Sequence, residues 1–293
     1  MPGCRCWYCI NPKSKLDTMK ILTVSGERSN YSPEKVANSL RRSGAKEHVI
    51  HDILSSLDKK LHEGMSTKEI YKLAYNLLKS QDGLTASRYK LKKAIFELGP
   101  TGFPFERFIG AILEHSGYKT EVGKIIPGAC VSHEVDVIAT RGEKRLFIEC
   151  KFHSDQGRNC NVKIPLYIHA RFQDIRKHAP QKGEINQIFN EGWVVTNTRF
   201  TKDALQYSQC VGLKLLSWDY PAGFGLKDRI DKLGLYPITV STLLSAREKQ
   251  FLLSRDKVLY KDLKNNEFLL DQLEISPGRK QKILKEIDDL CGS

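Results

Sequence analysis

The stretch from Val135 to Lys151, which reads VDVIATRGEKRLFIECK, decides the fold that this sequence predicts. Two runs rich in β-branched and apolar residues flank Gly142-Glu143, and glycine at the first position of a two-residue loop suits a type II′ turn. The pattern therefore predicts a β-hairpin in which Arg141 faces Lys144. Continued outward, the same register pairs Asp136 with Glu149 and Glu134 with Lys151.

Both outer pairs are charged and share one face of the hairpin, because side chains alternate between faces along a strand. Val137, Ile148 and Cys150 fall on the other face. Opposed residues in an antiparallel pair have Cβ atoms roughly 5 Å apart, and like charges there repel. We therefore expect a divalent cation between Asp136 and Glu149, since Mg²⁺ takes one or two carboxylates and otherwise keeps water or phosphate oxygens. The alternative is a solvated acidic face with one surface ion pair.

The sequence around the hairpin alternates between helical and strand patterns. Apolar residues recur at helical spacing from Phe105 to Leu113, and this helix is expected to end near Gly117. After the hairpin come a polar loop (154–160), a helix to Arg176, a strand (193–196), a helix opened by Thr201 and a strand (214–218). This order predicts an α/β fold with a sheet flanked by helices.

Residues 103–220 resemble the Mrr-type branch of the PD-(D/E)xK nucleases, whose restriction-endonuclease-like fold is a mixed sheet flanked by helices. The resemblance is carried by Phe105-Glu106, Gly117-Tyr118, Asp136, Glu149-Cys150-Lys151 and the run from Val194 to Ala204. It implies that Asp136 and Glu149 hold Mg²⁺ or Mn²⁺, that Lys151 is the catalytic lysine, and that Glu106 is an accessory acid.

Some of these polar residues fit two interpretations. Glu106 is also an ordinary first-turn glutamate that stabilises the helix dipole. Glu134 would support the metal ligands or pair with Lys151, and His133 is expected to be structural. In the catalytic interpretation the cation polarises the phosphodiester, while Lys151 orients the attacking water or offsets developing charge.

A stripe of side chains after Lys151 lies along one predicted helical face: Lys163, Tyr167, Arg171 and Asp174. Cations contact phosphates and aromatic rings stack on bases, so such a line suits a nucleic-acid backbone. Lys163, Tyr167 and Arg171 are therefore candidate DNA-binding residues. The alternative is a solvated face with an Arg171–Asp174 ion pair.

Residues 19–98 predict a small, mainly helical domain. Ser32-Pro33 is an N-cap with proline at the first helical position, Ser66 and Glu69 form a capping-box pattern, and further helices are expected over 47–63 and 85–98. The region resembles an ATP-cone, the nucleotide-binding regulatory domain at the front of many ribonucleotide reductases. The resemblance is carried by residues 21–28, 31–36, 40–45, 64–70 and 88–89.

The ATP-cone resemblance implies that Gly26 forms a turn, that Lys35 contacts phosphate and that Thr67 lies near the nucleotide, with ATP or dATP as effector. The sequence departs from the family at one place. ATP-cones usually carry a basic pair just before the turn glycine, whereas Thr23-Val24 stands there ahead of Ser25-Gly26. The alternative for Lys35 is a solvated lysine at a helix start.

The two ends of the chain carry weaker patterns. Cys4, Cys6 and Cys9 form a cluster in residues 1–18, but a structural zinc site needs four ligands, which favours a tail and linker over a metal knuckle. Residues 231–293 read as helical, with helices expected over 240–253, near 259–263 and over 268–273. The turn from Leu273 to Gly278 resembles a helix-hairpin-helix, with a plain packed helical pair as the alternative.

Composition limits the class of protein. The 293 residues are 40% hydrophobic and carry a net charge of +13, with most of the basic excess in the first hundred residues, which suits polyphosphate ligands or nucleic acid. No apolar run approaches the roughly 20 residues that span a bilayer, and the N-terminus lacks a signal-peptide core. The other five cysteines are scattered along the chain, which favours reduced thiols. A cytoplasmic protein with no membrane partner is expected.

Together these patterns predict a metal-dependent endodeoxyribonuclease regulated by a nucleotide effector. A homodimer is one arrangement that would cut both strands. One alternative is a non-enzymatic, nucleotide-responsive DNA-binding regulator, because a cysteine cluster ahead of an ATP-cone also resembles a repressor of ribonucleotide reductase genes, although the four-cysteine zinc ribbon is missing. Another alternative is a nuclease that acts on RNA.

Overall fold

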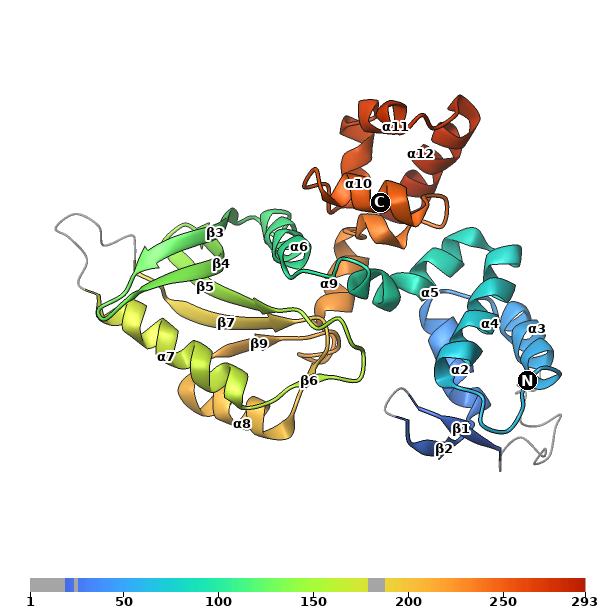
Figure 1. Ribbon diagram of the computed structural model, residues 1–293, viewed down its shortest axis with the longest axis horizontal. Helices are drawn as coiled ribbons and strands as arrows, with labels where there is room; N and C mark the ends of the chain where they lie inside the picture. The colour runs from blue at the N-terminus through green and yellow to red at the C-terminus, as the bar shows by residue number, and fades with distance from the viewer. Residues whose placement is uncertain (1–18, 24–25, 179–187, 293) are drawn as a thin grey trace, which may run out of the picture. The chain divides into compact units, whose positions relative to one another are not determined.

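The computed structural model describes residues 19–23, 26–178 and 188–292, which form two compact units, residues 1–90 and 91–293 (Figure 1). The helix α5 (Gly83–Phe96) runs through the division between them. The predicted tail with Cys4, Cys6 and Cys9 lies outside the described residues. Among the helices that are described, none is long and apolar enough to cross a membrane.

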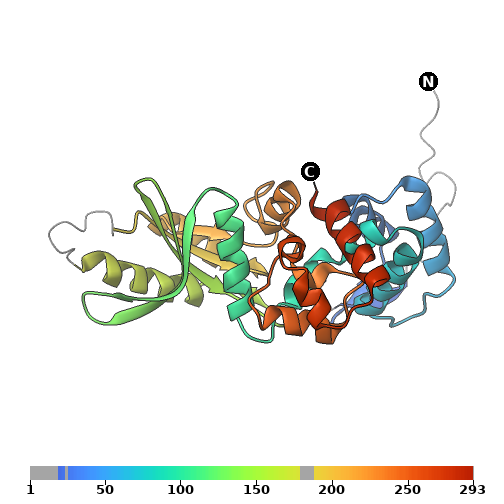
Figure 2. The same cartoon turned by 90° about the horizontal axis from the view of Figure 1, so that it is seen from above.

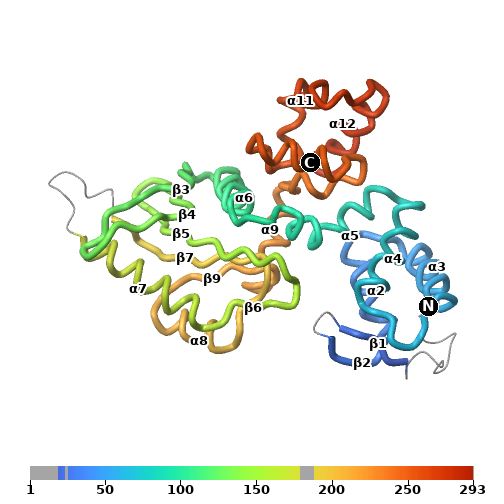
Figure 3. Tube along the Cα trace, in the orientation of Figure 1, coloured from blue at the N-terminus to red at the C-terminus, as the bar shows by residue number. Residues whose placement is uncertain are grey.

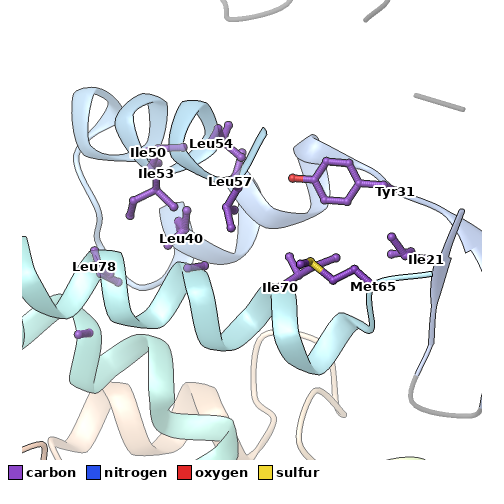
Figure 4. Packing of buried hydrophobic residues seen from close by; sticks show 13 residues of the cluster. Ile21, Tyr31, Leu40, Ile50, Ile53, Leu54, Leu57, Met65, Ile70 and Leu78 are labelled. Atoms are coloured by element: carbon purple, nitrogen blue, oxygen red, sulfur yellow. The ribbon is translucent and has the colours of Figure 1, made fainter. Parts of the chain in front are cut away.

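Unit 1 is a small hairpin followed by helices. The strands β1 (Lys20–Leu22) and β2 (Arg28–Asn30) pair antiparallel, and the chain continues through α2 (Pro33–Arg42), α3 (Glu47–Asp58), α4 (Thr67–Gln81) and the start of α5. The predicted caps are confirmed: Ser32 Oγ accepts from the Lys35 amide at 3.4 Å, and Ser66 and Glu69 form a capping box. Buried side chains from the hairpin and helices form one apolar cluster (Figure 4).

Unit 2 is built on a five-stranded mixed sheet in the order β3-β4-β5-β7-β9. The first two pairings are antiparallel and the last two are parallel. Figure 3 shows the path of the chain through this sheet. The strands are β3 (Lys119–Pro127), β4 (Ser132–Arg141), β5 (Lys144–Lys151), β7 (Glu191–Thr196) and β9 (Lys214–Leu216). The α/β class with a mixed sheet flanked by helices, predicted from the sequence, is confirmed.

Helices cover both faces of this sheet. The helix α6 (Phe103–Glu114) packs Phe105, Phe108 and Ile109 onto one face, and α7 (Lys163–Lys177) and α8 (Lys202–Val211) lie against the other (Figure 1). A short parallel pair, β6 (Asn159–Cys160) with β8 (Arg199–Phe200), joins the loop after β5 to the loop after β7. The predicted N-cap at Thr201 is confirmed by its bond from the Ala204 amide.

The C-terminal part of unit 2 is helical, as predicted. It contains α9 (Leu226–Leu233), η2 (Ile238–Val240), α10 (Ala246–Leu253), η3 (Tyr260–Asn265), α11 (Phe268–Gln272) and α12 (Pro277–Cys291), seen from above in Figure 2. The predicted start of α10 at Val240 is wrong. Ser241 and Thr242 bind Glu286 of α12, and Ser245 caps the helix, which starts at Ala246. Arg107 of α6 forms an ion pair with Asp256, which follows α10, at 2.9 Å.

Candidate active site

The hairpin register is the one that the sequence predicts. Arg141 pairs with Lys144, Gly142 has φ +58 in the turn, and the ladder continues to the pair of Val137 with Ile148. A positive φ is the conformation that the first position of a type II′ turn needs and that glycine adopts without strain. The hairpin therefore brings the polar residues beyond this ladder to one end of β4 and β5.

The two strands part just before the charged pairs, which corrects the predicted opposition of Asp136 with Glu149 and of Glu134 with Lys151. Asp136 Oδ2 accepts a hydrogen bond from the Cys150 amide at 2.7 Å, so the Asp136 side chain takes the place of a backbone acceptor. Beyond Ile148, β5 remains paired, among the described strands, only with β7, its neighbour on the other side, and Lys151 lies beside Thr196. Asp136 and Glu149 are thus not a pair in the β4–β5 ladder, and only their side chains interact.

Gly123 on β3, the strand on the other side of β4, lies next to the same irregular position. It has φ +64 and lies between the pairs Val122 with Val137 and Lys124 with Val135, which puts it beside Asp136. Val135 and Ile138 both join the cluster against α7, although strict alternation would separate them. The sheet is thus irregular where the acidic residues project, a feature that the sequence signals only through a glycine inside a strand pattern.

Three carboxyl groups share this end of the sheet. Burial, then the charge of Asp136, raises the pKa of Glu149 to about 7 against the opposing effect of Arg171. Burial, then Asp136 and Glu134, raises the pKa of Glu106 on α6 to about 7. Burial also raises the pKa of Asp136, although the hydrogen bond from Cys150 opposes it. The structure therefore brings Glu106, Asp136 and Glu149 into one electrostatically coupled group.

Glu149 is held by a neighbour that sequence reasoning assigned to another role. Arg171 Nη1 binds Glu149 Oε1 at 2.6 Å, with only 11% and 17% of the two side chains exposed, and the same guanidinium also donates to the Glu134 carbonyl. The second oxygen, Glu149 Oε2, is buried and has no hydrogen-bond partner among the described residues. A buried carboxylate oxygen without a donor is costly, so it marks a place that suits a cation.

The residues of the predicted stripe on α7 differ in their exposure and in their partners. Tyr167 is 62% exposed and Lys163 begins the helix. Arg171 is mostly buried against Glu149, with its guanidinium 5.5 Å from the Tyr167 ring centroid. Asp174 accepts from His133 at 2.8 Å and from the Cys130 amide at 2.9 Å, so it fastens the β3–β4 turn instead of forming the ion pair suggested by the alternative.

Lys151 is exposed, and its charge partly opposes the rise that burial causes in the pKa of Asp136. Sequence reasoning missed the residues that hold the strand end on which Lys151 sits. Thr196 Oγ1 donates to the Lys151 carbonyl at 2.7 Å, and the Asn197 amide group binds both the amide and the carbonyl of His153. The buried Thr196-Asn197 pair after an apolar strand was the available signal, because buried polar side chains need hydrogen-bond partners.

The donor set fits a magnesium-like ion. Among the described residues, no group of three or more His, Cys, Asp and Glu side chains is placed to hold a metal ion. Asp136 and the unpartnered Glu149 Oε2 supply the one or two carboxylates that Mg²⁺ usually takes, with water or substrate phosphate for the remainder. These residues would hold the cation predicted from the sequence.

Two of the three predicted nucleotide residues of unit 1 line one pocket. Lys35 and Thr67 both line it, together with side chains of the β1–β2 hairpin and of α4 and α5. Gly26 has φ +82 in the turn before β2, where its amide donates to Thr23 at 3.0 Å. The structure thus brings Lys35 and Thr67 together.

Comparisons with known proteins find relatives of unit 2. The Mrr catalytic family model, described as restriction endonuclease, matches residues 100–220, and a model described as AF1548-like, C-terminal, matches residues 236–291. An uncharacterised protein of Archaeoglobus fulgidus is 40% identical over 129 residues, which make up 44% of this chain and 68% of that protein. A crystal structure of AF1548, a protein of unknown function, has a TM-score of 0.53 and 30% identity, and the match covers 66% of this chain and 99% of that one.

Residues 100–220 are therefore a restriction-endonuclease-like domain of the Mrr type, which indicates a nuclease. The chain belongs to the AF1548-like family, and the match to AF1548 covers 66% of it.

Proposed function

We propose that unit 2 is a divalent-cation-dependent endonuclease that hydrolyses DNA phosphodiester bonds. The observation that carries the proposal is the buried, unpartnered Glu149 Oε2 beside Asp136 and Glu106, whose carboxyl groups all have raised pKa values. Three such groups in one place repel each other unless protons or a cation neutralise them. Mg²⁺ or Mn²⁺ held by Asp136 and Glu149 would polarise the phosphodiester and make a bound water more acidic.

The chain's own residues divide the remaining work. Lys151, exposed at the end of β5, donates hydrogen bonds to the scissile phosphate and offsets the charge that develops on its oxygens. Glu106, with a pKa of about 7, accepts or returns a proton near neutral pH. Arg171 binds Oε1 of Glu149 and leaves Oε2 without a hydrogen-bond partner among the described residues, so Oε2 would serve as the ligand of the cation.

DNA is the substrate we propose, and α7 is the surface we expect it to follow. Tyr167 and Lys163 lie on the helix that carries Arg171 next to the carboxylates, and both are polar side chains able to contact a backbone. The guanidinium of Arg171 is already bound to Glu149, and only 11% of this side chain is exposed, so its contacts with DNA would be limited. A homodimer would supply two such sites for the two strands.

Unit 1 is proposed to sense a nucleotide and to regulate cleavage. Its support is the pocket that contains Lys35 and Thr67 next to the turn at Gly26, as the ATP-cone resemblance implies.

The test of the nuclease is cleavage of supercoiled plasmid with Mg²⁺ or Mn²⁺. We expect Lys151→Ala and Asp136→Asn each to lower the rate by roughly a hundredfold or more, because each removes charge stabilisation at the reacting phosphate. Lys144→Ala is the matched control, since Lys144 lies at the far end of the same hairpin and pairs with Glu191. It should cut at the parental rate.

Two results would decide against this proposal. Cleavage that persists unchanged in both active-site variants would mean that another site or protein cuts the DNA. Salt-sensitive DNA binding without turnover in either metal would favour the non-enzymatic regulator. Digestion of an RNA of the same sequence, run side by side, separates the RNA nuclease from the DNA nuclease.

A further inference from the structure

Unit 1 contains a pocket of about 260 Å³ between the β1–β2 hairpin, the first turns of α2 and α4, and Tyr89 of α5. Its wall combines three tyrosine rings, several hydroxyl groups and one charged side chain, Lys35. Pockets for drug-sized ligands span about 300–1,000 Å³. This pocket is slightly smaller, so it suits a base with its sugar better than a longer ligand.

The tyrosines give the pocket a rigid aromatic side. Tyr71 and Tyr89 are stacked, with ring centroids 5.1 Å apart and planes 10° from parallel, and Tyr75 continues the stack at 6.3 Å from Tyr71. Tyr31 is 3% exposed and extends from the segment between β2 and α2 toward Leu57 of α3 (Figure 4). Flat aromatic side chains held in place favour a planar ring as ligand.

Two hydroxyl groups at this pocket have no partner. The Tyr31 hydroxyl and Thr67 Oγ1 are buried and make no hydrogen bond with the residues that the structure describes. Leaving a buried hydroxyl unsatisfied is unfavourable by about 1–3 kcal/mol. Both residues line the pocket, so a ligand with hydrogen-bonding groups on its ring or sugar would relieve that cost.

The charge of the pocket suits one phosphate and not three. Lys35 is the only charged residue among the described lining residues. Each bordering helix already has a carboxylate in its first turn, Glu34 in α2 and Glu69 in α4, where an anion would otherwise bind. The cap bonds also occupy the amides of Lys35 and Glu69.

We propose that this pocket binds a nucleoside monophosphate, with the base against the tyrosines and the phosphate on Lys35. The proposal rests on the nucleotide-sensing role proposed for unit 1 and narrows it, because a β- or γ-phosphate would find no further cation among the described lining residues. A triphosphate would therefore gain little affinity over the monophosphate.

The experiment measures binding to the full chain by calorimetry, without DNA or divalent cation. The probes are the four ribonucleoside monophosphates, their nucleosides and their triphosphates. We expect at least one monophosphate to bind, its triphosphate to bind within about fivefold, and its nucleoside to bind about tenfold more weakly, because a hydrogen bond to a charged group accounts for that ratio.

Lys35→Met tests the assigned phosphate contact. It should weaken binding of the monophosphate to the level of the nucleoside and leave the nucleoside unaffected. Lys60→Met is the matched control, because Lys60 is an exposed lysine of unit 1 outside the pocket lining. Thermal unfolding of both variants checks that the fold is kept.

Three outcomes would overturn this inference: no monophosphate binds, a triphosphate binds more than fivefold tighter, or Lys35→Met leaves the monophosphate unaffected. The nuclease proposal is judged separately, because these measurements need no cleavage. A chain that binds a monophosphate but leaves plasmid intact contradicts the nuclease alone.

Discussion

Glu106 shows how position changes the chemistry of an ordinary residue. It lies in the first turn of α6, where a glutamate usually stabilises the helix dipole as an exposed anion. Here burial and the neighbouring carboxylates of Asp136 and Glu134 raise its pKa from 4.5 to about 7. The folded chain therefore retains a proton that the unfolded chain releases at lower pH. The contribution of Glu106 to the free energy of unfolding therefore decreases as pH rises from about 4.5 to about 7.

We predict that Glu106→Gln stabilises the protein above pH 7, because it removes a charge that folding disfavours. The gain at pH 8 should be on the order of 1 kcal/mol, with little change at pH 4, where the group is protonated in both states. Urea denaturation at the two pH values measures the difference. Glu114→Gln, at the exposed other end of α6, serves as control. An equal effect of Glu106→Gln at both pH values would contradict the assigned cause.

Arg171 gives a second prediction at this scale. Removing one partner of a mostly buried ion pair leaves the other uncompensated, so Arg171→Ala should destabilise unit 2 by roughly 2–3 kcal/mol at pH 8. The loss should be smaller at pH 5, because Glu149 then carries a proton in place of its partner. Chemical denaturation measures both values, and Lys177→Ala, exposed on the same helix, should change neither. A loss that does not depend on pH would show that Arg171 acts through packing alone.

At the scale of elements, the irregular place in the sheet is the feature that exposes the site. Gly123 adopts a left-handed conformation beside Asp136, and a Cβ there would meet only Glu134 Oε1, at 4.0 Å. The cost of a side chain is therefore conformational and not steric.

We predict that Gly123→Ala destabilises unit 2 by about 1–2 kcal/mol, the cost of the left-handed region for a residue with a Cβ. Gly278→Ala is the comparison, because Gly278 lies in α12 with open space around it and an ordinary φ. Alanine favours the helix there, so that variant should be neutral or slightly more stable. Thermal unfolding of the two variants gives the result, and equal midpoints would argue against strain at Gly123.

The elements that the sequence predicted share one property: their determinants are local. The turn at Gly142, the caps at Ser32, Ser66 and Thr201, and the register of Arg141 with Lys144 each depend on residues only a few positions apart. The misassigned elements depend on distant partners. Glu286 of α12 holds the segment after Val240 out of a helix, and the Cys150 amide draws Asp136 out of the ladder. Likewise, the partner of Arg171 lies 22 residues away on β5.

At the scale of the whole molecule, the chain divides into two compact units whose proposed ligands differ. We predict two calorimetric transitions on heating. A ligand that binds one folded unit stabilises that unit alone. Mg²⁺ should raise only the transition of unit 2, and the nucleoside monophosphate only that of unit 1. Asp136→Asn and Lys35→Met identify which transition belongs to which unit. A single transition shifted by both ligands would instead show that the units unfold together.

The shared carboxylates at the end of β4 and β5 have one further consequence. Near neutrality Glu106 and Glu149 are each partly protonated, so a cation that docks there must expel hydrogen ions into the surrounding buffer. Its apparent affinity would then depend on acidity, and the heat of docking would vary with the ionisation enthalpy of the buffer chosen. The affinity of this site for a cation would therefore be lower at acid pH than at alkaline pH.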